Sequence, residues 1–393
     1  MPGTRRALIS GVLGVVACRV GPRGGRCVAG ERLVGVDAPG DALVSAGGGI
    51  DGALDGGLVA VLEGALKKVH AGSRAVGVSA AVALPGRGCW AGQRGVAVVD
   101  PPTQLAEGAS FQAASIGKLM TAVVVHRMVE RGELGLEMRL DRWFPGFPES
   151  AGISVDMLLR HTSGAHDFSA DARAEDDNLR YRDPDALIAE AEKGAPAFCP
   201  GTGWAYSNTG YVLLGKIVEA VRGRAFAAVL AEEVFAPLGL RATRMNVPRV
   251  APAVRGHRGG VQVPPEIDYA TPFAAGGVVS NAAELVRVLH ATLAGELLRA
   301  ATVRRMLTGT LPMFGDPSLR YGAGIMLYQV PDGPGTMIGH SGGARGCRAI
   351  VAYVPADVAY VSVMFNDEAP AEAGLWALLR ALREGRAARV GQR

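Results

Sequence analysis

The chain has 393 residues, of which 49% are hydrophobic and 20% charged, and its formal net charge is +4. This composition excludes an intrinsically disordered chain, and five cysteines are too few for a small scaffold held by disulfides. The length allows one large two-lobed domain, which would bury roughly three quarters of its unfolded surface. Basic residues are scattered and aromatic residues are 6% of the chain, so we expect no nucleic-acid partner.

The N-terminus has the pattern of an export signal. Arg5 and Arg6 precede an apolar run over 7–17, which is too short to span a bilayer. The run leads into Cys18 through Val-Val-Ala, a sequence similar to the lipobox of bacterial lipoproteins, and this similarity predicts a lipid anchor on Cys18. We expect 1–18 to be a signal or lipoprotein signal peptide. A misassigned start codon is the alternative, and it would leave the protein cytoplasmic.

Export would place the protein in the periplasm, outside the cell or on a membrane through its lipid. Residues 19–55 are rich in Gly, Val and Arg without a clear period, and we expect a flexible linker there. An oxidising compartment would also allow disulfides, in a pairing that the sequence leaves open. The cysteines available for it are Cys27, Cys89, Cys199 and Cys347. Their spacing does not suit a metal site, and we expect no metal and no cofactor.

The first ordered elements follow the linker. Apolar residues at helical spacing predict a helix over 57–71. Two Val/Ala-rich runs, 76–84 and 90–99, are separated by a Pro-Gly-Arg-Gly turn and predict two strands of a meander.

Helical patterns then dominate until strand character returns near the C-terminus. Residues 112–300 are mostly helical in pattern, and a final helix is expected over 371–386. Strands are predicted at 321–330, 349–354 and 359–364. Strands at both ends with helices between them predict one sheet built from distant segments, with a helical lobe inserted.

The motif with the most direct chemistry is Ser115-Ile116-Gly117-Lys118. A serine hydroxyl is a weak nucleophile until a nearby base takes its proton. A helix starting near Ser115 would place Lys118 one turn further on the same face. The chain has only five lysines, so this spacing carries more weight here than in an average protein.

Other motif matches fail on their context. Gly47–Gly52 fits a dinucleotide-binding pattern but lies in the linker. A near match to the P-loop places Ile217 where Ser or Thr is needed. Ser341 lies in a G-x-S-x-G sequence, but strand character follows it, and the last histidine of the chain, His340, precedes it. A hydrolase nucleophile elbow needs a following helix and a later histidine.

Two further short motifs complete a set with Ser115 and Lys118. Tyr206-Ser207-Asn208 precedes an amphipathic helix, and His340-Ser341-Gly342, which alone would be a tight turn, precedes an apolar strand. The order S-x-x-K, Y-x-N, H-x-G is similar to the S-x-x-K, S-D-N, K-T-G set of penicillin-recognising enzymes. The chain thus resembles the serine β-lactamase and DD-peptidase superfamily, in the branch of class C β-lactamases, DD-carboxypeptidases and related esterases.

The resemblance extends over roughly 57–368. Its further blocks are 158–164, 200–215, 237–240, 275–280 and 339–346. It implies an α+β fold, with an antiparallel sheet flanked by helices and an all-helical lobe at about 112–275, in a domain over 56–388. The segment His161–Gly164 is interpreted as scaffold.

The resemblance also assigns roles. We expect Ser115 to attack a carbonyl and form an acyl-enzyme, while Lys118 and Tyr206 share the proton. A cation beside a phenol lowers its pKa, which predicts Tyr206 as base and then as acid. Asn208 would contact Lys118 or the substrate amide. Backbone N–H groups of Ser115 and Gly343 would bind the oxyanion, and His340, Ser341 and Gly342 would line the substrate site.

Departures from the family pattern limit the substrate prediction. His340 stands where class C β-lactamases have lysine, so we expect weaker carboxylate binding, with Arg345 or Arg348 as candidate replacements for the positive charge. Gly117 stands where the family usually has Ser or Thr, which we expect to loosen the helix start. Three functions follow: an amide hydrolase of the DD-carboxypeptidase or β-lactamase type acting on a small molecule or peptide, an esterase of the same fold, or a non-catalytic binding module. The oligomeric state is left open.

Overall fold

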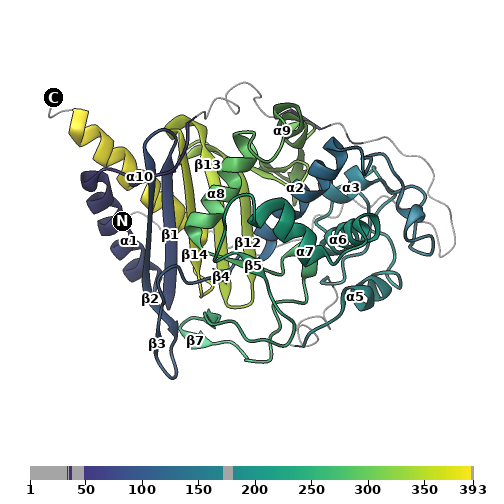
Figure 1. The fold of residues 1–393 in the computed structure, drawn as a ribbon, viewed down its shortest axis with the longest axis horizontal. Helices are drawn as coiled ribbons and strands as arrows, with labels where there is room; N and C mark the ends of the chain where they lie inside the picture. The colour runs from purple at the N-terminus through teal and green to yellow at the C-terminus, as the bar shows by residue number, and fades with distance from the viewer. Residues whose placement is uncertain (1–32, 34, 38–47, 171–179, 391–393) are drawn as a thin grey trace, which may run out of the picture.

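The computed structural model describes residues 33, 35–37, 48–170 and 180–390. Its centre is an antiparallel nine-stranded sheet in the order β3-β2-β1-β14-β13-β12-β11-β10-β9, which Figure 1 shows between a helix pair on one side and a helical lobe on the other. The strands are β1 (Gly77–Leu84), β2 (Gly88–Val98), β3 (Thr103–Gln104), β9 (Leu311–Met313), β10 (Asp316–Tyr321), β11 (Met326–Val330), β12 (Gly335–Ala344), β13 (Cys347–Val354) and β14 (Ala359–Phe365).

The central strands are buried on both faces, which explains why they are apolar throughout rather than alternating. On β1, Ala80 and Val82 belong to one core, while Ala81 and Ala83 belong to the other. The first core is covered by α1 (Gly56–Ser73) and α10 (Ala371–Val390), which also pack on each other.

The opposite face of the sheet is covered by α8 (Ala282–Leu293), which packs on β1, β13 and β14. Beyond it lies the helical lobe (Figure 1). The lobe contains α2 (Gly117–Glu130), α3 (Val155–Arg160), α5 (Pro184–Ala191), α6 (Asn208–Arg222) and α7 (Phe226–Leu230), and α9 (Ala300–Leu307) leads back to the sheet. A small sheet has the order β4 (Phe111–Gln112), β8 (Val278–Ser280) and β5 (Arg244–Met245), and β4 precedes α2 in the chain. A further pair is formed by β6 (His257–Arg258) and β7 (Val261–Gln262).

Most of the predicted elements are confirmed, with two corrections. Within the run 321–330, only Met326–Val330 is a strand, β11, and Tyr321 is the last residue of β10. The chain turns between them, where Gly324 has a φ of 84° and approaches Ala122 too closely for a side chain. His340-Ser341-Gly342 is not a tight turn but lies inside β12, paired with β11 and β13. Its glycines and polar residues hide the strand pattern, and the neighbouring strands supply the hydrogen bonds.

The described part of the predicted linker is packed against the domain. Ile50 and Leu54 are buried, and Val36 pairs with Thr310, so these residues do not behave as a free tether. Cys18 and the predicted signal peptide lie outside the described residues. No helix within the described ranges has the length and apolarity to cross a membrane. Of the cysteines, Cys89 and Cys347 are free thiols, and Cys199 is disulfide-bonded.

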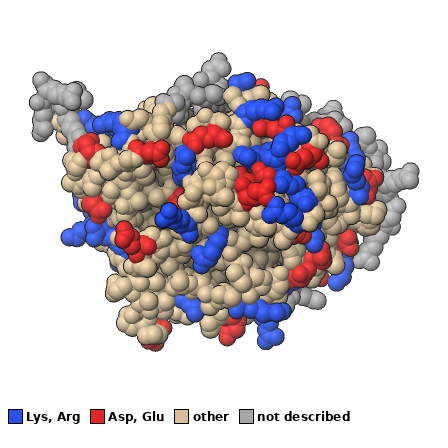
Figure 2. Space-filling model, viewed as in Figure 1, with Lys and Arg blue, Asp and Glu red and all other residues tan. Residues whose placement is uncertain are grey.

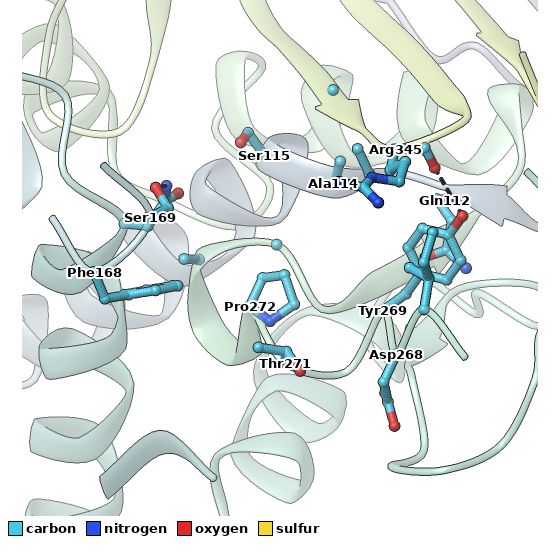
Figure 3. Close-up of a pocket in the computed structure, with 16 residues that line it drawn as sticks. Gln112, Ala114, Ser115, Phe168, Ser169, Asp268, Tyr269, Thr271, Pro272 and Arg345 are labelled. Carbon is cyan, nitrogen blue, oxygen red and sulfur yellow. Dashed lines mark hydrogen bonds between the residues drawn. The ribbon is translucent and has the colours of Figure 1, made fainter. Parts of the chain in front are cut away.

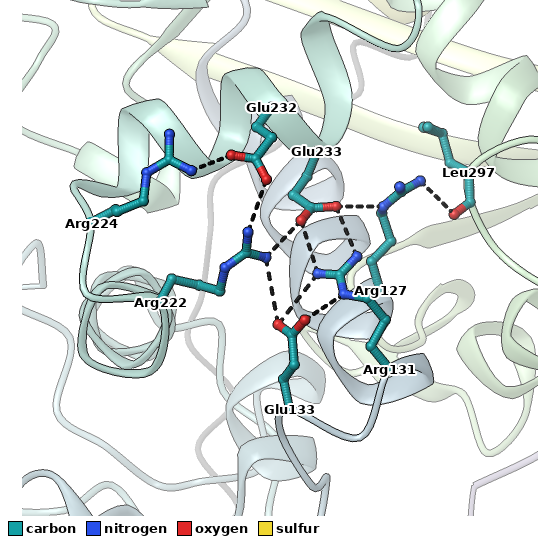
Figure 4. A network of polar contacts seen from close by, with 8 residues as sticks. All are labelled: Arg127, Arg131, Glu133, Arg222, Arg224, Glu232, Glu233 and Leu297. Atoms are coloured by element: carbon teal, nitrogen blue, oxygen red, sulfur yellow. Dashed lines mark hydrogen bonds and ion pairs between the residues drawn. The ribbon is translucent and has the colours of Figure 1, made fainter.

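A network of charged residues ties the helical lobe together at Glu233, on a π-helical turn that continues α7. Its buried carboxylate accepts from Arg127 at 2.7 Å, Arg131 at 2.8 Å and Arg222 at 2.7 Å (Figure 4). Burial raises the pKa of Glu233, but these three hydrogen bonds outweigh it and hold the pKa at about 2. Over the surface, Figure 2 shows acidic and basic side chains close together on the visible face of the lobe.

Candidate active site

Ser115 lies on a short 3-10 turn, Ala114–Ile116, that leads directly into α2. Ala114 before it has a φ of 48°, a strained backbone conformation of the kind that clusters at functional sites. The turn is held by close backbone contacts, because a Cβ on Gly342 would lie 2.2 Å from the Ala113 carbonyl oxygen. Gly117 is buried, and a Cβ there would lie 3.3 Å from the Cα of Gly276, so a glycine lets the helix start approach that loop.

Lys118 is completely buried one turn after Ser115. Its ammonium nitrogen donates to Ser115 Oγ at 3.3 Å, to Asn208 Oδ1 at 2.7 Å and to the Ala275 carbonyl at 2.6 Å. Burial lowers the pKa of Lys118 to about 7, and the charge of Asp167 opposes the shift. A lysine with that pKa is half neutral near pH 7 and can take the Ser115 proton.

Tyr206 is hydrogen-bonded to Ser115. The sequence predicted a lowered pKa for Tyr206, and this prediction is wrong in direction. Burial raises the pKa of Tyr206, and the hydrogen bond to Ser115 opposes that shift only in part. The Lys118 nitrogen lies over the ring, 4.8 Å from its centroid. Tyr206 therefore keeps its proton in the resting site and can give it up only when another proton replaces it, and Lys118 is the better base.

Asn208, the first residue of α6, connects the lysine to the helical lobe. While its carbonyl oxygen accepts from Lys118, its amide nitrogen donates to Ser169 Oγ at 2.9 Å and to Asp167 Oδ2 at 3.3 Å. The predicted contact with Lys118 is confirmed. Ser207 caps α6 by accepting from the Gly210 N–H, which fixes the turn that carries Tyr206 and Asn208.

The end of β12 passes beside the nucleophile. A Cβ on Gly342 would lie 3.2 Å from the Ser115 nitrogen, and Gly343 and Ser115 line the same cavity. This approach suits the predicted pair of oxyanion donors, Ser115 N–H and Gly343 N–H. Ser341 lies behind this edge, where its hydroxyl contacts the Met326 sulfur at 3.6 Å.

His340 is fully buried, and so it does not line the cavity as predicted. Its Nδ1–H donates to the Ser341 carbonyl at 2.6 Å, which leaves Nε2 to accept from the Tyr321 hydroxyl at 3.1 Å. Burial lowers the pKa of His340 to about 3, and the nearby Lys118 charge adds to the shift. His340 is therefore neutral at physiological pH and is not a carboxylate ligand.

A cavity of about 310 Å³ opens at Ser115. Figure 3 shows Phe168 and Ser169 on one side, Tyr269 and Arg345 on the other, and Pro272 below. Of the two arginines predicted to supply positive charge, Arg345 lines this cavity. Arg348 instead donates to the carbonyls of Ala344 and Cys347 and is not among the lining residues.

His161 has a closer relation to the site than a scaffold role suggests. It ends α3 in a left-handed conformation, its Nδ1 accepts from the Ser207 N–H at 3.1 Å, and its ring lies 4.3 Å from that of Tyr206. His161 thus holds both the backbone and the ring of the Tyr-Ser-Asn turn. His161 and Tyr206 are far apart in the sequence, so no short motif contains both residues and predicts this contact.

A family profile described as Beta-lactamase matches residues 62–384. The chain belongs to the beta-lactamase family. Its similarity to the D-amino acid amidase of Ochrobactrum anthropi SV3 extends over 84% of this chain and 99% of that one, with a TM-score of 0.74 and 25% identity. This match confirms the beta-lactamase-like α+β fold.

Two curated relatives represent different activities within the beta-lactamase family. The chain is 31% identical to Penicillin-binding protein 4* of Bacillus subtilis over 60% of its length and 56% of that protein. It is 32% identical to Esterase EstB of Burkholderia gladioli over 47% of its length and 50% of that protein. The matched segments thus span about half of these relatives. At the level of the family, the chain is a serine hydrolase.

Proposed function

We propose that this serine hydrolase cleaves the amide bond of a small amide or short peptide whose acyl part is a D-amino-acid residue. The observation that carries the proposal is that Ser115 is hydrogen-bonded both to Lys118 and to Tyr206, two groups whose pKa values are shifted by burial in opposite directions. Lys118, with a pKa of about 7, is able to take a proton, while Tyr206, whose pKa is raised by burial, keeps one. An amine must gain a proton before it can leave, so amide cleavage needs such an acid more than ester cleavage does.

In the proposed reaction, Lys118 takes the proton of Ser115 as Oγ attacks the amide carbonyl. The N–H groups of Ser115 and Gly343 stabilise the oxyanion. Tyr206 donates its proton to the leaving nitrogen, the C–N bond breaks, and Lys118 restores the proton to Tyr206. Water then attacks the acyl-serine, gives its proton to Lys118, and the acid leaves as the proton returns to Ser115.

The preference for a D-residue rests on relatives and on cavity size. One solved relative is the D-amino acid amidase of Ochrobactrum anthropi SV3, and a curated relative from Cereibacter sphaeroides, 27% identical over 62% of this chain, is a D-aminopeptidase. The cavity of about 310 Å³ has room for one amino-acid residue rather than a long chain. A carboxypeptidase must bind a free carboxylate, for which the neutral, buried His340 is poorly suited. Esterase activity is the second candidate, supported by the similarity to Esterase EstB.

A parallel turnover assay tests this proposal. We expect D-alaninamide to be hydrolysed faster than L-alaninamide, a D-Ala-D-Ala peptide, a chromogenic cephalosporin or p-nitrophenyl acetate. A penicillin or fluorophosphonate label should appear on the peptide that contains Ser115 and disappear in Ser115→Ala. The half-buried Ser318→Ala on β10 is the matched control and should still be labelled. Hydrolysis of the esters alone would replace the amidase by an esterase, and label on Ser341 would overturn the assignment of the nucleophile.

We also propose that the protein is exported and anchored through Cys18. Fractionation of cells expressing the full chain and Cys18→Ala tests this. The wild-type protein should be in the membrane fraction, and the variant should be released. Equal distribution of both would contradict the anchor.

A further inference from the structure

We propose that Trp204 and Phe314 form an aromatic subsite for the leaving group, which takes an apolar, uncharged substituent on the departing amine. This inference rests on the proposed amide hydrolysis and specifies the other half of the substrate.

Phe314 is a large apolar residue that is exposed in a turn between two strands. It lies between β9 and β10 with 64% of its surface exposed, so burial in the core does not explain it. Its φ is 53°, in the left-handed region that costs an L-residue about 1 kcal/mol and that glycine adopts freely. The positive φ belongs to the two-residue turn that Phe314 and Gly315 make between the paired Met313 and Asp316. Such a turn favours Asn or Gly, so the hairpin does not explain an exposed phenylalanine at this position.

The position of Phe314 relates it to the catalytic tyrosine. Its ring meets that of Trp204 edge to face, with centroids 5.4 Å apart, and its centroid lies 6.4 Å from that of Tyr206. None of these three rings lines the cavity at Ser115, although Tyr206 is hydrogen-bonded to Ser115. The rings of Trp204 and Phe314 therefore lie near the reacting atoms on the side of Tyr206, outside the cavity.

The chemistry of the reaction assigns this place to the leaving group. If Tyr206 gives its proton to the departing nitrogen, that nitrogen lies against the Tyr206 hydroxyl, and its substituent lies beside the neighbouring rings. The acyl part then occupies the cavity on the other side of Ser115.

The surroundings of the subsite favour an apolar substituent. Trp204 and Tyr206 pack against a core that includes the buried residues Met313, Met326 and Tyr328. His340, where class C β-lactamases have a lysine, is buried and hydrogen-bonded to Tyr321. A benzyl group, or the side chain of an apolar residue, would gain contact with two aromatic rings here, whereas a free carboxylate would lose water without gaining a charged partner.

Two substrates with the same acyl group test the subsite. We expect the wild-type protein to cleave D-alanine benzylamide with a kcat/KM about tenfold above that of D-alanine methylamide, since apolar contacts of this size discriminate by roughly 10-fold to 200-fold. Phe314→Ala and Phe314→Gly should each bring this ratio close to one. Phe314→Gly also relieves the backbone strain, so its loss of preference should come with an equal or higher melting temperature. Val261→Ala, an exposed apolar residue on β7, is the matched control and should keep the wild-type ratio.

A second measurement does not depend on amide cleavage. The acetyl-enzyme formed from an acetate ester is offered benzyl alcohol or methanol, whose oxygen attacks the acyl carbon while its proton passes to Lys118. The Ser115 Oγ bond breaks, Ser115 regains the proton, and the new acetate ester is measured against acetate. We expect benzyl alcohol to be about tenfold the better acceptor, and Phe314→Gly to remove this advantage.

The two measurements separate the two proposals. Absence of amide turnover together with a Phe314-dependent preference for benzyl alcohol would overturn the proposed amidase and keep the subsite. Amide turnover with equal ratios in the wild-type protein and both Phe314 variants would overturn the subsite and keep the amidase.

Discussion

Two buried charged groups lie along α2 and differ in how firmly they keep their charge. Lys118 lies at the start of the helix, and Glu233 is bound by arginines at its other end. Glu233 accepts from three arginines, one of which, Arg127, lies on α2. Lys118 is hydrogen-bonded to a hydroxyl, an amide and a carbonyl, and within the described residues it has no hydrogen bond to a carboxylate. The pKa of Glu233 falls to about 2, which keeps it ionised, and the pKa of Lys118 falls to about 7, which makes it able to lose its proton.

The difference shows how one helix carries both a structural and a reactive charge. Opposite charges compensate for the loss of water around Glu233, so its ionised form is favoured in the folded state. Neutral dipoles around Lys118 compensate only in part, so the lysine exchanges its proton near pH 7.

The largest expected effect comes from Lys118→Arg. A guanidinium remains charged at every accessible pH, so it would not take the Ser115 proton. We expect kcat/KM to fall by about 10³-fold, within the range for loss of a general base. Lys216→Arg, at a lysine paired with Asp185 and Glu219, is the matched control and should keep full activity. Circular dichroism must show a folded variant. A folded Lys118→Arg with more than a tenth of wild-type activity would contradict Lys118 as base.

The second effect is on stability. Because the folded pKa of Glu233 is depressed to about 2, its contribution is complete above the ordinary value of 4.5 and is lost as the pH falls towards 2. Glu233→Gln should lower the free energy of unfolding by about 3 kcal/mol at pH 7 and by less at pH 3, as measured by urea denaturation. Glu232→Gln, at the exposed neighbour, should have a much smaller effect. An equal loss at both pH values would argue against a charge effect.

A smaller effect is expected at His161, which holds Tyr206 through its ring and through the Ser207 N–H. His161→Phe keeps a ring but removes the acceptor, and His161→Asn keeps an acceptor but removes the ring. We expect either change to lower kcat roughly tenfold with little change in KM, because the proton donor is displaced while the cavity is intact. Equal changes in KM and kcat, or loss of the fold in both variants, would argue for a purely structural role.

The smallest effect is a shift in the pH profile. Activity should rise with pH through about 7, since Lys118 must be neutral to act as base. The negative charge of Asp167 raises the pKa of Lys118, so Asp167→Asn should move this rising limb to lower pH. Asp268→Asn, on the far side of the cavity, should leave the limb in place. A limb that moves to higher pH in Asp167→Asn would contradict the electrostatic account.

The sequence predicted those parts of the site that depend on short spacing. Ser115 and Lys118 are one helical turn apart, and the geometry follows from the helix alone. The residues around His340, taken alone, predicted a tight turn, because neighbouring strands rather than its own residues determine its strand state. The proton state of Tyr206 was predicted in the wrong direction because burial, which only the packed structure reveals, outweighs the nearby cation. The Glu233 cluster and the rings around Tyr206 join residues far apart in the chain, where no local pattern exists.

The pairing of β1 with β14 has a consequence for synthesis of the protein. The first long strand after α1 obtains its second neighbour only from Ala359–Phe365, near the end of the domain. A chain still emerging from the ribosome therefore carries Ser115 long before β12 and β14 can complete the sheet around it. Labelling of Ser115 by a fluorophosphonate should accordingly begin only when residues beyond β14 have left the ribosome, which would make this label a measure of completed folding.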